Sequence, residues 1–145
     1  MADSYTPSID MKDLLVAGGI GAFGGTAEWG IFIGREPDSP NSHDHVVTLY
    51  DTPGDPPDPK YLLDYPRFQV RVRSTDYDAG FQKAEAIKNI LLGLPSQVIN
   101  GTRWVGVWVV IDTHFLHADE KGRAIFVTTY RSIREPNTGQ NRLEF

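Results

Sequence analysis

Residues 65–74 (YPRFQVRVRS) most constrain the fold, because their side chains alternate between apolar and polar. In an extended strand the two sets lie on opposite faces: Phe68, Val70 and Val72 against Arg67, Gln69, Arg71 and Arg73. The period then becomes helical over residues 76–92. We therefore expect a strand followed directly by a helix, with the apolar face of the strand packed under residues 81–91.

Two helices are predicted. The stronger begins with Asp76 or Asp78 as its N-cap and ends near Leu92, before Gly93 and Pro95. Its apolar stripe consists of Phe81, Ala84, Ile87, Ile90, Leu91 and Leu94. A shorter helix follows Ser8, the expected N-cap, and ends at Gly18.

Four further strands complete the expected sheet. Residues 29–33 and 46–50 are predicted to pair as an antiparallel hairpin. Residues 104–115 and 124–133 form a second hairpin around the turn at 119–123. Both faces of the 104–115 strand are apolar, which is more than a half-exposed sheet requires.

The expected fold class is α+β, with two helices on one face of a mostly antiparallel five-stranded sheet in the order α-β-β-β-α-β-β. Residues 1–145 are predicted to form a single domain. Its ends, about residues 1–7 and 135–145, are expected to be flexible, and residues 51–66 to form a proline-rich loop.

Composition argues against several functional classes of protein. A net charge of −5 argues against general affinity for nucleic-acid backbone, and the lack of cysteine removes disulfides and thiolate metal sites. The N-terminus lacks the pattern of a signal peptide, and no apolar run approaches the roughly 18 residues that span a bilayer. The chain is therefore expected to be made in the cytoplasm.

No reactive constellation is predicted, so we expect no catalytic residue, cofactor or metal. Residues 19–24 match G-x-G-x-x-G, but a helix precedes and a strand follows them, the reverse of a dinucleotide site. His43 and His45 lie in a loop, while His114 and His117 are expected on opposite faces of their strand. A small nucleotide-dependent enzyme stays open as an alternative.

The arginine row has two interpretations. It pairs with carboxylates on neighbouring strands, or it contacts another subunit, where the guanidinium fork binds carboxylates. The candidate interface residues are Arg67, Arg71, Arg73, Trp104, Trp108, Pro56, Pro57 and Phe145.

Four segments together resemble the minor capsid or tail terminator proteins of long-tailed, siphovirus-like bacteriophages: residues 31–40, 50–54, 65–74 and 119–123. The resemblance implies a non-enzymatic virion protein that forms a ring, commonly a hexamer, on the head-proximal end of the tail tube. Such a ring stops tube polymerisation, meets the connector or neck, and lets DNA pass without specific binding. Another head-tail joining protein, a stopper or connector adaptor, is the alternative.

Overall fold

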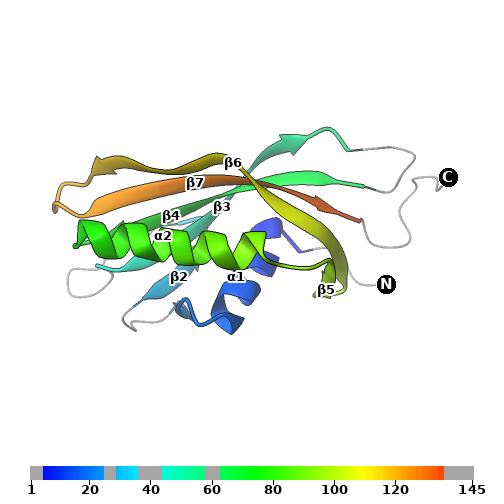
Figure 1. Cartoon of the computed structure of the whole chain (residues 1–145), viewed down its shortest axis with the longest axis horizontal. Coiled ribbons are helices and arrows are strands. Elements are labelled where there is room, and N and C mark those ends of the chain that lie inside the picture. Colours follow the sequence, from blue (N-terminus) through cyan, green and yellow to red (C-terminus); the bar gives the residue numbers. More distant parts are fainter. Residues whose placement is uncertain (1–4, 25–28, 36–43, 58–62, 136–145) are drawn as a thin grey trace.

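The computed structural model describes residues 5–24, 29–35, 44–57 and 63–135. Within these ranges, two helices lie on one face of a strongly curled, seven-stranded sheet of order β1-β2-β3-β4-β7-β6-β5 (Figure 1). The elements are α1 (Pro7–Ala17), β1 (Ala22–Phe23), β2 (Gly30–Ile33), β3 (Val46–Asp55), β4 (Tyr65–Ser74), α2 (Tyr77–Leu92), β5 (Gln97–Ile99), β6 (Thr102–Ala118) and β7 (Ala124–Arg134). The α+β class and the two helices are confirmed, but the prediction of five strands is wrong. Neither described helix is long and apolar enough to cross a membrane.

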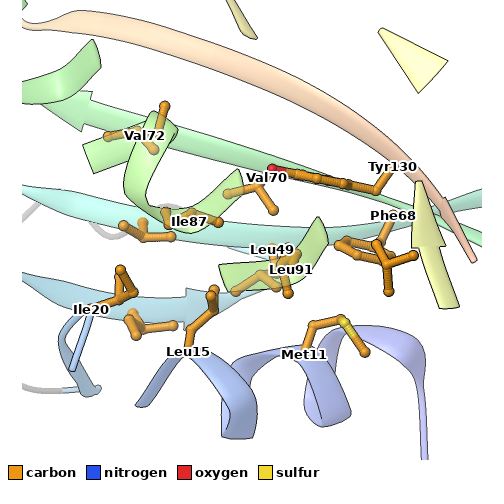
Figure 2. Packing of buried hydrophobic residues seen from close by; sticks show 14 of the residues in the cluster. Met11, Leu15, Ile20, Leu49, Phe68, Val70, Val72, Ile87, Leu91 and Tyr130 are labelled. Atoms are coloured by element: carbon orange, nitrogen blue, oxygen red, sulfur yellow. The ribbon is translucent and has the colours of Figure 1, made fainter. Parts of the chain in front are cut away.

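β4 is the predicted strand residue for residue, and it lies at the centre of the sheet between β3 and β7. Its apolar face is buried, with Phe68 fully covered, as expected from the alternation. Both helices contribute to this core. Figure 2 shows the side chains that meet there: Met11 and Leu15 from α1, Ile87 and Leu91 from α2, and Leu49, Phe68, Val70, Val72 and Tyr130 from the sheet.

The expected hairpin of residues 29–33 with 46–50 is wrong, because β2 and β3 are parallel. Gly30 lies opposite Val46, and Ile33 lies opposite Leu49. Residues 34–45 connect the two strands, and a connection of about a dozen residues is long enough to return the chain to the starting end. β1 also runs parallel to β2, so the sheet is mixed.

The predicted loop at residues 51–66 is shorter than expected, because β3 continues to Asp55 and β4 begins at Tyr65. The register shifts between Thr52 and Asp55, and proline is tolerated at such a bulge because no ladder donor is needed there. Pro53 therefore does not end the strand. A Cβ on Gly54 would overlap the carbonyl oxygen of Tyr65, so the close approach of β3 to β4 at this point requires glycine.

The sequence interpretation missed the two shortest strands, β1 and β5. The Asn100–Gly101 turn that joins β5 to β6 was predicted, and both residues have the positive φ of such a turn, 50° and 79°. Three residues before a turn carry too little periodicity to identify a strand.

One predicted helix cap is confirmed and the other is wrong. The Asp76 side chain accepts a hydrogen bond from the Asp78 N–H at the start of α2. Ser8 instead lies inside α1, where its N–H donates to Asp51 Oδ1 from β3 at 3.0 Å. A distant carboxylate therefore satisfies one of the free donors of this helix. The α2 stripe is also displaced, since Gly80 is buried against Phe126 while Phe81 is 38% exposed.

Asp10 is a fully buried carboxyl that joins α1 to the β5–β6 hairpin. It accepts hydrogen bonds from Trp104 Nε1 at 2.9 Å and from Asn100 Nδ2 at 2.8 Å. Burial raises the pKa of Asp10 above its usual value, and the two hydrogen bonds only partly oppose this shift. The contact fixes the position of α1 against the edge of the sheet that β5 and β6 form.

Replacing Asp10 by alanine should lower the free energy of unfolding by about 2–3 kcal/mol, because the indole and amide donors lose their buried acceptor. Asp13→Ala is the matched control, since Asp13 also accepts from Asn100 Nδ2 but its side chain is 40% exposed. Urea unfolding at one low protein concentration measures both losses. Equal losses in the two variants would contradict the assigned role of Asp10.

Candidate assembly surface

β6 presents an open edge over most of its length. β5 pairs only with Thr102, Arg103 and Trp104. From Val105 to Ala118, no described strand lies on the outer side of β6, and its inner side pairs with β7. An open edge of this length offers backbone donors and acceptors to another chain.

Four register shifts interrupt the β6–β7 ladder, and they turn apolar side chains outward. They lie between Trp104 and Gly106, Val109 and Ile111, Ile111 and His114, and Phe115 and His117. Each adds one residue to β6 without a partner in β7. We call the exposed apolar residues of this strand the β6 apolar edge: Val105, Trp108, Val110, Ile111, Phe115 and Leu116, each between 39% and 52% exposed.

The first bulge also separates Trp104 from Trp108, which a regular strand would place on one face. Trp104 lies opposite Arg134 and is 2% exposed, bonded to Asp10 in the core. Trp108 lies opposite Arg131 and is 39% exposed, with the Arg131 guanidinium 5.6 Å from the ring centroid. Trp104 is therefore not available as a contact residue, whereas Trp108 is.

The same irregularity corrects the expectation for the two histidines. His114 lies opposite Val127 and His117 opposite Ile125, which are alternate residues of β7. Both histidines therefore lie on one face, not on opposite faces. Each ring lies within hydrogen-bonding distance of a nearby backbone carbonyl, of Asp112 or of Ala118. No group of three or more metal-ligating side chains occurs in the parts of the chain that the structure describes.

The arginine row lies on the face of the sheet away from both helices, which we call the far face. Arg67 forms an ion pair with Asp55 on β3 at 3.1 Å, as the cross-strand interpretation predicts. Arg71 donates from Nε to Gln69 Oε1 at 3.1 Å and lies over the Tyr50 ring. Arg73 is only 3% exposed, so it is not part of a solvated row.

The β6–β7 turn is built around the carboxylate of Asp119. Its Oδ1 accepts from the N–H groups of Lys121 and Arg123 at 3.0 and 2.9 Å, and its Oδ2 accepts from Arg123 Nε at 2.8 Å. Burial alone would raise the pKa of Asp119, but the hydrogen bonds and charge of Arg123, with the Lys121 N–H, hold it below its usual value.

Beside this turn, the far face contains a hollow of about 360 Å³, which we call the basic hollow. Its lining is Arg71, Arg73, His117, Asp119, Glu120, Lys121, Arg123 and Ile125. This lining contains four permanent cations and two carboxylates, and Asp44 forms a further ion pair with Arg123 at 3.6 Å, in a chain whose net charge is −5. The sequence pattern predicted Arg71 and Arg73, but the contribution of the turn depends on the β4–β7 pairing.

The remaining predicted interface residues lie apart from this region. Pro56 and Pro57 are exposed just after β3 ends, and Phe145 lies outside the described residues. Residues 19–24 lead from α1 into β1, and the order of helix before strand is the reverse of a dinucleotide site, as expected. The surface residues that the sequence analysis missed are Val105, Val110, Ile111, Phe115 and Leu116; their signal was a strand apolar on both faces.

An exposed apolar strand edge and a charged face are typical of a structural subunit that associates with other chains. Residues 10–136 match the model of the bacteriophage tail terminator protein family, and the chain belongs to this family. It is therefore a structural, non-enzymatic component of the virion tail, and the family associates with the tail tube.

A solved structure supports the fold independently. The chain is similar to a protein in the virion of a native gene transfer agent particle, with a TM-score of 0.65 and 18% sequence identity. The match covers 90% of this chain and 95% of that one. Among curated proteins, no match was found.

The Asp119 turn should make the free energy of unfolding depend on pH in the acidic range. Because the folded pKa is lowered, its contribution is complete above the usual aspartate pKa and is lost as the pH falls through the folded value. The free energy of unfolding should therefore fall less steeply in Asp119→Asn than in the wild type between about pH 5 and about pH 2.

Asp112→Asn is the control for this titration. Lys88 lowers the pKa of Asp112, but that side chain is 71% exposed and solvent screens the pair. Denaturant unfolding across the pH range should show a smaller change of slope there. A wild-type slope in Asp119→Asn would show that the turn contributes nothing to the acid dependence.

Proposed function

We propose that this chain forms a ring, most simply a hexamer, on the head-proximal end of the tail tube. The ring stops polymerisation of the tube and presents its opposite face to the connector or neck. Family membership supports the tail location. The observation that carries the proposal of a ring is the β6 apolar edge, which a single chain leaves in water.

Association through the β6 apolar edge has two sources of free energy. Covering its side chains removes apolar surface from water, at roughly 25 cal/mol for each Å² buried. The outer edge also provides backbone groups that another chain can pair. The four bulges make a regular ladder difficult, so we assign most of the interaction to the side chains.

The candidate contact residues contribute differently. Trp108 belongs to the β6 apolar edge, and Arg67 and Arg71 are half-buried arginines whose forks suit carboxylates on a neighbour or on the tube. Pro56 and Pro57 extend from the end of β3, where a loop can reach a second subunit. Phe145 is proposed as an apolar contact at the end of the chain. Trp104 and Arg73 are buried, so they would support the contact surface and expose little area to a partner.

A ring at this position encloses a channel through which DNA leaves the head. We propose that DNA passes without specific binding, and the net charge of −5 is consistent with this because a strongly basic lumen would retain phosphate. The same net negative charge disfavours binding to an anionic membrane surface.

Charge placed on the β6 apolar edge should prevent assembly without unfolding the chain. Ile111 is 52% exposed, so Ile111→Lys should keep the wild-type unfolding midpoint but lose ring formation. Light scattering on the purified chain and negative-stain microscopy of tail tubes incubated with it measure this loss. Leu92→Lys, at a 46% exposed apolar position on α2, is the control.

Two results would overturn this function. If Ile111→Lys forms rings on tube ends as the wild type does, then the β6 apolar edge is not the contact. If the wild-type chain binds purified portal complexes and not purified tubes, then the protein is a stopper or connector adaptor instead of the ring that caps the tube.

A further inference from the structure

The basic hollow and the α2 N-terminus lie at the same end of the sheet but on opposite faces. Ser74 at the end of β4 pairs with Ala124 at the start of β7, and Arg73 pairs with Ile125. Arg73 and Ile125 line the hollow on the far face. One residue further along β7, Phe126 faces α2, where it packs against Gly80 and Tyr77.

The segment Asp76-Tyr77-Asp78, which we call the acidic corner, is exposed at all three positions, with Tyr77 54% exposed. The Asp76 N–H donates to Ser74 Oγ at 3.1 Å, and Asp76 Oδ1 accepts from the Asp78 N–H at 3.2 Å. The Tyr77 ring packs on Phe115 and Phe126 with centroids 5.4 and 4.9 Å apart. The Asp76 carboxylate and the backbone that carries Asp78 are therefore held in place before any partner arrives, which lowers the entropy cost of binding.

The lining of the basic hollow favours carboxylates on a protein over a polyanion. Glu120 and Asp119 lie among the cations, and a continuous phosphate backbone would meet both. Separate carboxylates can instead be placed beside the arginines and Lys121, where the guanidinium forks suit them. Arg73 and Arg123 are almost fully buried in this lining: Arg73 is 3% exposed and the Arg123 side chain is 4% exposed.

We propose that the basic hollow of one copy of this chain binds the acidic corner of a second copy. The inference rests on the proposed function only in that it takes the partner to be another subunit of the ring. Opposite charges at the two sites provide the complementarity.

The position of the two sites also determines the symmetry. Because they lie on opposite faces of one sheet, a copy cannot present both to the same neighbour. Each copy gives its acidic corner to one neighbour and receives that of another, which is a heterologous contact. Heterologous contacts close into rings when the rotation permits, whereas a twofold dimer would form neither of these contacts.

A charge exchange tests the contact. Asp78→Lys and Lys121→Glu are both at exposed positions, so each variant should stay folded, and only Asp78→Lys, in the first turn of α2, should lower the urea unfolding midpoint slightly. Each alone should weaken self-association by about tenfold or more, because it places like charges together. The double variant Asp78→Lys/Lys121→Glu should recover most of the wild-type association. The control double variant, Lys121→Glu/Glu135→Lys, restores net charge at a site remote from the hollow and should stay weak.

Association is measured by light scattering on the chain alone and by ring occupancy on purified tail tubes. Wild-type association by both single variants, or a double variant no stronger than the product of its singles, would overturn the proposal while the ring itself stands. A wild-type chain that forms no ring even on tubes would overturn the proposed function together with this contact. Fluorescence anisotropy with a short DNA duplex at physiological salt is the remaining arm. Binding that Lys121→Glu abolishes would assign the hollow to phosphate instead.

Discussion

The fold depends on one buried contact, in which the Asp10 carboxyl accepts hydrogen bonds from Trp104 and Asn100. Without it, the main contacts of α1 with the sheet would be those of Met11 and Leu15 and the hydrogen bond from the Ser8 N–H to Asp51, and apolar contacts alone do not specify a single orientation. A buried acid with satisfied partners does specify one, because any shift of the helix leaves polar groups unpaired. The burial that raises the pKa of Asp10 is thus part of what positions α1. The Asn100 conformation required by the β5–β6 turn also aims its amide at this carboxyl.

The β6 bulges determine what the rest of the molecule can contact. The first of them leaves Trp104 in the core and turns Trp108, four residues further along the strand, to the far face. A regular strand would have kept both tryptophans on one face, either burying both or exposing both. Curvature of the sheet has the same origin, since each extra residue bends the strand that carries it. The exposed apolar side chains are therefore a consequence of how β6 is paired, and the described part of the chain leaves them in contact with water.

How far the sequence predicts this structure depends on the range of the interaction involved. β4 and the cap of α2 were predicted correctly because alternation and an aspartate before a helical period are local signals. The parallel pairing of β2 with β3 was not, since the same two apolar segments fit either direction and only the route of the chain decides. The Asp51 cap of α1 joins residues 43 positions apart, which no local pattern reveals. At the candidate surface, the arginine row was visible, but Lys121 and Arg123 join it only through the tertiary pairing of β4 with β7.

Two different kinds of surface therefore remain open on a subunit of the tail. The β6 apolar edge gains free energy in proportion to the area it buries, but it discriminates poorly between partners. The proposed contact between the basic hollow and the acidic corner would contribute less free energy in water, yet it would disfavour any arrangement that brings like charges together. A terminator must attach to the tube and then accept no further tube subunit, which is a requirement for specificity more than for affinity. In the proposed assembly, the β6 apolar edge would supply most of the affinity and the charged pair most of the specificity.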